Sequence, residues 1–215
     1  MALEHWLIYL VAAFGLSLTP GPNGLLALTH GMRFGLRRSI ATLLGGVVGF
    51  LLLIAVSMAG LGALLAASEQ AFTIAKWAGA AYLVYLGIRT WRAPVTVPVR
   101  AENLPQGMSG EKSRREGPAA LFLQGFLVAT SNPKALIFFA AFLPQFMVPG
   151  VSLPLQFAIL GGTFVIVEFC YELVLAGAAQ RIAPWLYRHG RLVNRMAGAT
   201  FIGIGGVLAT ANRAV

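Results

Sequence analysis

The sequence reads LTPGPN at residues 18–23 and TSNPK at residues 130–134, and each run interrupts a long apolar stretch. Proline removes a backbone donor and clashes with the preceding turn, so a helix is expected to break at each run. In lipid, such irregular backbone is tolerated where it is buried in protein or lines a wet cavity. Broken helices at corresponding places in two halves of a chain are typical of a transporter with a site near the membrane midplane.

The composition indicates that most of the chain lies in a membrane. Of its 215 residues, 58% are hydrophobic and 11% are charged, with a mean hydropathy of +0.77, whereas an ordinary soluble domain carries roughly 25% charged residues. The net charge of +9 comes from basic clusters between apolar stretches. That pattern is typical of loops flanking membrane spans and argues against a nucleic-acid partner.

A spanning helix needs roughly 20 mostly apolar residues, and six candidate spans fit this chain. We expect them at about 3–31 (interrupted), 40–67, 71–90, 119–147 (interrupted), 153–179 and 196–212. The predicted fold is therefore an all-α integral membrane protein of six transmembrane helices, with the first and fourth broken at the proline runs. The amphipathic segment 181–195 suits a short helix at the membrane surface.

Most of the basic residues fall in three of the predicted loops. They are Arg33, Arg37, Arg38, Arg89, Arg92, Arg100, Lys112, Arg114, Arg115, Arg181, Arg188, Arg191 and Arg195. The positive-inside rule places these loops in the cytoplasm, which puts both termini outside a bacterial inner (plasma) membrane. The longest loop, at 93–117, is rich in Pro, Gly, Ser and charge and is predicted to be a flexible cytoplasmic linker.

The two halves, 1–92 and 118–215, resemble each other. KWAGAAYL at 76–83 matches RMAGATFI at 195–202, and Gly-Gly pairs occur at 45–46 and 161–162. Because each half has three predicted spans, the second half must insert upside down relative to the first. The sequence thus predicts two inverted three-helix repeats in a single membrane domain, a recurrent transporter design.

Each proline break can start a new half-helix, with Pro22 or Pro133 as its first residue. Asn132 is suited to cap the second half-helix, and Thr19 could act likewise in the first. Free amides and the positive end of a helix dipole favour an anion such as a carboxylate, and Lys134 adds a full charge. The plainer interpretation is that the prolines are only kinks, with Lys134 reaching the interface or pairing with a glutamate.

Glu168 and Glu172 form an i, i+4 pair in the fifth predicted span, with Tyr171 between them. These buried carboxyl groups could bind an amine, pair with Lys134 or relay protons. Glu172 lies nearer the cytoplasmic end, so pairing with an interfacial arginine is an equal alternative. One cysteine and no His pair at ligand spacing argue against a metal site, and no phosphate-binding Gly-rich motif is present. We expect no cofactor and no enzymatic activity.

The proline runs, the NPKALIFF run at 132–139 and the six predicted spans resemble the LysE/RhtB family of amino-acid exporters. The resemblance implies a bacterial inner-membrane exporter of amino acids or close derivatives, driven by the proton gradient. The positions matching its motifs are Pro20, Gly21, Pro22, Asn23, Asn132, Pro133 and Lys134.

The expected function is secondary transport of a small zwitterion. The breaks at Thr19–Asn23 and Asn132–Lys134 would hold its carboxylate, while Glu168, with Tyr171, would meet its amine or carry the coupling proton together with Glu172. The alternatives are an exporter of another small solute or ion on the same scaffold, and a channel. The sequence leaves the substrate and any homo-oligomer open.

Overall fold

The structure is a computed structural model that describes residues 3–19, 21–67, 69–94, 116–148 and 150–210. For some helical residues within these ranges only the backbone is described: 61–67, 69, 71, 72, 75, 76, 79, 133, 137, 141, 187, 204, 207, 208 and 210. The described part of the chain is helical and holds no β-strand. The all-α prediction is therefore confirmed. Pro20 and most of the predicted linker lie outside the described residues.

The helices follow one another with short connections. They are α1 (Leu3–Leu18), α2 (Pro22–Ala67), α3 (Glu69–Arg92), α5 (Pro118–Thr130), α6 (Pro133–Phe142), the 3₁₀ turn η2 (Leu143–Phe146), α7 (Leu153–Gly177) and α8 (Ala179–Thr210). The two predicted interruptions are present, because α1 ends just before the first proline run and α5 ends just before the second. Each new helix begins on a proline, which lacks the amide that the first helical residue leaves unpaired in any case.

The predicted basic loop between residues 31 and 40 is reduced to a single non-helical residue, Gly35, at which two helices join. Helix α2 runs through this region and changes direction at Gly35, whose φ of 73° and ψ of 167° are accessible mainly to glycine. His30 Nδ1 and Thr42 Oγ1, from the two limbs of the kink, are 2.7 Å apart in a hydrogen bond. Similarly, the predicted surface segment 181–195 and the following span form one helix, α8, which contains Pro184.

Two described helices are long and apolar enough to cross a membrane. They are Pro22–Gly60, with 39 residues, and Leu153–Gly177, with 25 residues. Helices α1 and α5 are apolar but shorter than a full span, because each ends at a proline run. The number of six spans therefore stays a prediction.

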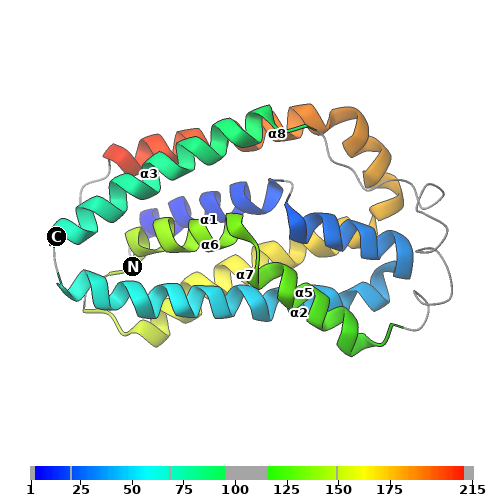
Figure 1. Ribbon diagram of the computed structural model, residues 1–215, viewed down its shortest axis with the longest axis horizontal. Helices are drawn as coiled ribbons and strands as arrows, with labels where there is room; N and C mark the ends of the chain where they lie inside the picture. The colour runs from blue at the N-terminus through cyan, green and yellow to red at the C-terminus, as the bar shows by residue number, and fades with distance from the viewer. Residues whose placement is uncertain (1–2, 20, 68, 95–115, 149, 211–215) are drawn as a thin grey trace.

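The helices pack in two groups, with the broken helices between them. Figure 1 shows α3 beside α8 along one long side of the molecule, α2 with α5 and α7 along the other, and α1 and α6 between the two groups. The α2–α5 contact is very close, since a methyl group added to Gly45 would overlap the Phe122 carbonyl oxygen and one added to Gly125 would overlap that of Thr42. Small residues allow helix backbones to approach in this way.

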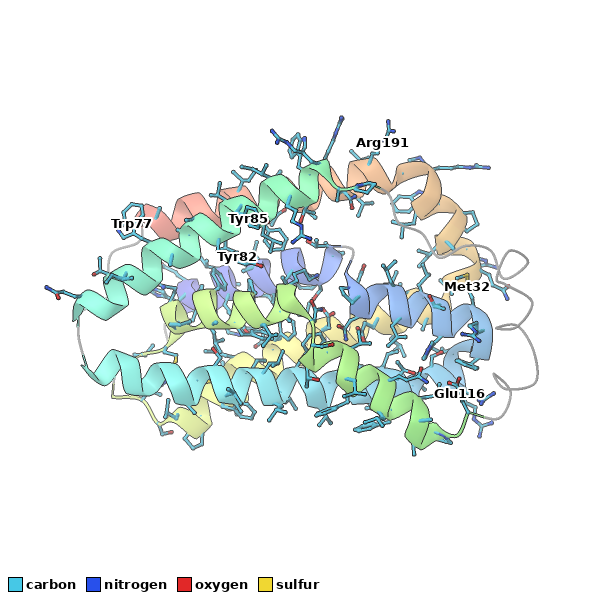
Figure 2. The ribbon with its side chains drawn as sticks, viewed as in Figure 1. Met32, Trp77, Tyr82, Tyr85, Glu116 and Arg191 are labelled. Atoms are coloured by element: carbon cyan, nitrogen blue, oxygen red, sulfur yellow. The ribbon has the colours of Figure 1, made fainter. Side chains whose placement is uncertain are left out.

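The two ends of the molecule differ in their side chains. Figure 2 shows Met32 and Glu116 at one end and Trp77 at the other. At the first end, Arg38 Nη2 donates to the Glu116 carbonyl oxygen at 2.6 Å, and its guanidinium carbon lies 5.1 Å from the centroid of the Phe34 ring. Glu116, at the end of the predicted linker, is thus bonded to the α2 kink.

Candidate functional site

A cavity lies where the two interruptions meet, with about 270 Å³ of empty space that includes its open mouth. Six residues predicted for the site line it: Thr19, Gly21, Asn23, Asn132, Lys134 and Glu168. Residues more than 100 positions apart in sequence therefore share one space, as the sequence predicted.

The second interruption is organised by Asn132. Its side-chain oxygen accepts a hydrogen bond from the Lys134 backbone amide at 3.1 Å, so it caps α6 as predicted. Its Nδ2 donates to Asn23 Oδ1 at 3.0 Å, and both side chains are buried. One asparagine thus caps its own helix and joins it to the start of α2.

Both restarted helices present amides without a partner in their own helix. At the start of α2, the Leu25 amide makes the first hydrogen bond to a carbonyl oxygen four residues earlier, that of Gly21, at 3.0 Å. Because α2 begins with Pro22, the amides of Asn23 and Gly24 have no carbonyl partner within the helix. Both residues line the cavity.

Helix α6 repeats this arrangement. The Leu136 amide donates to the Asn132 carbonyl oxygen at 3.0 Å, and Asn132 already bonds the Lys134 amide. The Ala135 amide is then the one without an intrahelical carbonyl, and Ala135 also lines the cavity. Two positive helix ends therefore face the same space.

The sequence predicted that the Lys134 ammonium group would be available to an anion, but in the structure it is already bonded to the backbone. Its Nζ donates to the carbonyl oxygens of Leu16, at 2.8 Å, and Thr19, at 3.0 Å. These carbonyl groups lie at the end of α1, beyond the last amides of the helix, and that of Leu16 also accepts a hydrogen bond from the Thr19 amide at 3.2 Å. Lys134 thus caps the negative end of α1 with two of its three donors.

The carboxyl groups of Glu168 and Glu172 lie on the α7 side of the site. Their exposed fractions are 6% and 3%, and Glu168 Oε2 and Glu172 Oε1 have no hydrogen-bond partner. Both groups interact electrostatically with Lys134, yet no ion pair within hydrogen-bond reach joins these described residues. A methyl group added to Gly46 would lie 3.7 Å from Glu172 Oε2 and 3.5 Å from Asn23 Nδ2. Both side chains therefore lie close to Gly46.

Three predicted site residues, Pro22, Tyr171 and Glu172, are not among the described residues that line the cavity. Pro22 is exposed at the start of α2, and Pro133 starts α6 with its side chain outside the described set. Tyr171 packs against α2, where its hydroxyl would lie 3.7 Å from a methyl group on Gly24. Glu172 lies one helical turn beyond Glu168, near Gly46. Pro20 is outside the described residues.

Sequence reasoning missed half of the lining residues. They are Leu16, Ser17, Gly24, Phe50, Ala135 and Phe164. Phe50 and Phe164 form its apolar wall, with ring centroids 5.3 Å apart. Four of the six are directly beside or within three positions of a proline run, so proximity to the runs was the usable signal. Nothing in the sequence marks Phe50 or Phe164 among many apolar residues.

The cavity holds too few ligands for a metal ion. Among the described residues, no three His, Cys, Asp or Glu side chains come together. The single cysteine, Cys170, is exposed on α7. What the cavity does offer is amide donors, the Lys134 ammonium group and the Glu168 carboxyl group.

Comparison with known proteins identifies the class to which this fold and site belong. Residues 14–212 match the family described as LysE type translocator. The chain is 35% identical to the homoserine/homoserine lactone efflux protein of Salmonella typhimurium, over all of both chains. It is 31% identical to the leucine efflux protein of Salmonella choleraesuis, over 97% of this chain and 95% of that one. No solved structure matches it.

The chain belongs to the LysE type translocator family. It is also 34% identical, over 98% of its length and 99% of the relative's, to a protein of Vibrio cholerae described as an uncharacterized membrane protein. It is therefore a helical membrane protein of a translocator family. The family resemblance predicted from the proline runs is confirmed.

Proposed function

We propose that this protein is a secondary transporter that exports amino acids or close derivatives across the bacterial inner membrane in exchange for protons. Family membership supports the transport role. The relatives named for efflux of homoserine, homoserine lactone and leucine support a small substrate that carries an amino group. The observation on which the proposal depends is the cavity that joins the two helix interruptions.

The cavity is suited to a zwitterion because both donors and an acceptor line it. The amides of Asn23, Gly24 and Ala135, with the remaining donor of Lys134, offer partners to a carboxylate. Glu168 offers an acceptor to an ammonium group. The Asn23–Asn132 hydrogen bond keeps the two helix starts at one place, so both ends of a small substrate can be bound at once.

Proton coupling is assigned to the α7 carboxyl groups. Glu168 and Glu172 are buried, and each has an oxygen without a hydrogen-bond partner. A buried carboxylate without full pairing is costly, so a proton on one of them is favoured when no substrate cation is present. Exchange of that proton for a substrate ammonium group would link outward substrate flow to inward proton flow.

Alternating access is assigned to two inverted repeats, 1–92 and 118–215, rocking against each other. The contacts of α3 with α8 support this: Gly87 packs on the Gly198 carbonyl oxygen, and Gly205 packs on that of Ala80. The two helices therefore run antiparallel, as equivalent helices of inverted repeats should. In Figure 1 the start of α1 and the end of α8 lie at the same end of the molecule, opposite the start of α5, which supports placing both termini outside.

Uptake into inside-out vesicles tests the function. Vesicles containing the protein should accumulate L-homoserine or L-leucine when their interior is acidified, and a protonophore should abolish accumulation. Glu168→Gln should lose accumulation that depends on the pH gradient. Flux down a substrate gradient that ignores protons would favour a channel, and a lack of any amino-acid flux would favour another solute.

A further inference from the structure

Ser17 is a buried hydroxyl group that the family motif and the sequence argument both leave unassigned. It lies in the last turn of α1, its exposed fraction is 2%, and its Oγ has no hydrogen-bond partner. It lines the cavity together with Glu168. It is therefore a polar side chain that is buried, unpartnered and located at the site.

The other helical hydroxyl groups show that this is unusual. A serine or threonine within a helix commonly bonds the carbonyl oxygen four residues before it. Thr29 bonds Leu25 at 2.7 Å, Ser39 bonds Gly35 at 2.9 Å, and Thr200 bonds Met196 at 3.0 Å. Ser17 makes no such bond, although the residue four positions before it also belongs to α1.

The cost of leaving this hydroxyl unpaired favours a ligand. A buried polar group without a partner costs about 1–3 kcal/mol, and native structures contain few such groups. Glu168 Oε2 is also unpartnered and lies on the same cavity. Ser17 and Glu168 also interact with each other, so they lie close enough for one bound group to contact both.

The chemistry of the surroundings selects that group. Ser17 is on the negative, carbonyl end of α1, and Glu168 is an acceptor when ionised. The free backbone amides lie at the starts of α2 and α6. The Lys134 ammonium group already binds carbonyl oxygens at the same end of α1, so the acceptors that remain there for a group with N–H donors are Ser17 Oγ and the Glu168 carboxyl group.

We propose that Ser17 Oγ and Glu168 Oε2 together bind the ammonium group of the substrate, and that Ser17 thereby fixes which way the amino acid lies between α1 and the starts of α2 and α6. This inference rests on the proposed function. It adds a substrate-binding residue and an orientation, because the carboxylate then points toward Asn23 and Ala135.

Paired substrates test this assignment. L-leucine and its 2-hydroxy analogue, L-2-hydroxy-4-methylpentanoate, differ only at the group that Ser17 is proposed to bind. In proteoliposomes, Ser17→Ala should raise the half-saturating L-leucine concentration about tenfold, as expected for one hydrogen bond to a charged group. The maximal rate should change less than the half-saturating concentration. The concentration of the hydroxy acid that half-inhibits transport should stay the same.

Controls separate binding from folding. Ser131→Ala removes an exposed hydroxyl that bonds its own helix and should change neither value. Ser17→Cys, which keeps a weaker acceptor, should give an intermediate shift and provides a second variant if Ser17→Ala folds poorly. The same measurement with L-homoserine covers the other substrate named for a relative.

The results that contradict the proposal are distinct from failure of the proposed function. Equal shifts for L-leucine and the hydroxy acid, or no shift for either, would show that Ser17 does not bind the ammonium group. A wild-type protein that transports neither amino acid would instead contradict the proposed function, and the ammonium site with it.

Discussion

Lys134, in the second interruption, is joined to the first interruption by hydrogen bonds. Its ammonium group binds the carbonyl oxygens of Leu16 and Thr19, which lie 118 and 115 residues away in sequence. A cation at a helix C-terminus contributes about 0.3–1 kcal/mol even at exposed positions. Lys134 thus has a structural role at α1 and still retains a donor for a ligand. The simple alternatives of snorkelling or pairing with a glutamate do not describe these contacts.

The position of this ammonium group depends on the absence of a side chain at Gly21. A methyl group there would lie 3.0 Å from Lys134 Nζ and 3.3 Å from Cε. Gly21→Ala should therefore displace the ammonium group from α1 and slow amino-acid transport roughly tenfold, the equivalent of one charged hydrogen bond. The check is the initial rate of uptake into vesicles at equal amounts of protein.

A matched control for this change is Gly60→Ala. A methyl group on Gly60 would meet no atom within 4 Å, so its uptake rate should equal that of the wild type. Wild-type transport by Gly21→Ala would mean that the contact of Lys134 with α1 does not matter for transport.

Single residues were predictable from sequence where their partners are local. The cap that Asn132 makes on α6 follows from its place before Pro133. The bond from Asn132 to Asn23 crosses 109 residues and depends on how the helices pack, which one sequence does not reveal. Ser17 was missed because a helical serine usually bonds its own backbone.

At the scale of helices, the α2–α5 contact depends on glycine. A methyl group on Gly125 would overlap the Thr42 carbonyl oxygen and would come 3.0 Å from the Gly46 amide nitrogen. Gly125→Ala should therefore force these helices apart and destabilise the fold by about 1–3 kcal/mol, the usual cost of overpacking. Thermal unfolding of the purified protein in detergent measures the effect.

Gly162→Ala is the matched change on α7, since a methyl group there would meet nothing within 4 Å. Its unfolding temperature should equal or slightly exceed that of the wild type, because alanine favours a helix over glycine. If the two alanine variants unfold at the same temperature, the close α2–α5 packing does not contribute to stability.

Helix breaks could be predicted from sequence better than helix joins. Proline acts locally, so the ends of α1 and α5 were expected where they occur. The basic region around Gly35 was expected to be a loop because of its charge, but one glycine with positive φ is enough to turn the chain between two helices that join there. Charge predicts exposure to water, which a bent helix satisfies as well as a loop does.

For the whole molecule, the distribution of arginine predicts the direction of insertion. In a Cys170→Ser background, Ser152→Cys should react in intact cells with a maleimide that does not cross membranes. Gln180→Cys, at the start of α8, should react only after the cells are opened. Both positions are exposed. The reverse pattern would place the basic end outside and contradict the proposed export direction.

The central claim is that the cavity between the two interruptions is the place where the substrate binds. Ala135 lines it and has an exposed fraction of 1%, whereas Ala140 lies in the same helix on an exposed face. In the Cys170→Ser background, each alanine can be replaced by cysteine and labelled with a small methanethiosulfonate reagent. The most direct measurement is the labelling rate with and without L-homoserine or L-leucine.

The account predicts that a transported amino acid slows labelling of Ala135→Cys, with half-protection at the concentration that half-saturates transport, and leaves labelling of Ala140→Cys unchanged. An Ala135→Cys variant that transports the amino acid while its labelling rate is unaffected would show that the substrate binds elsewhere.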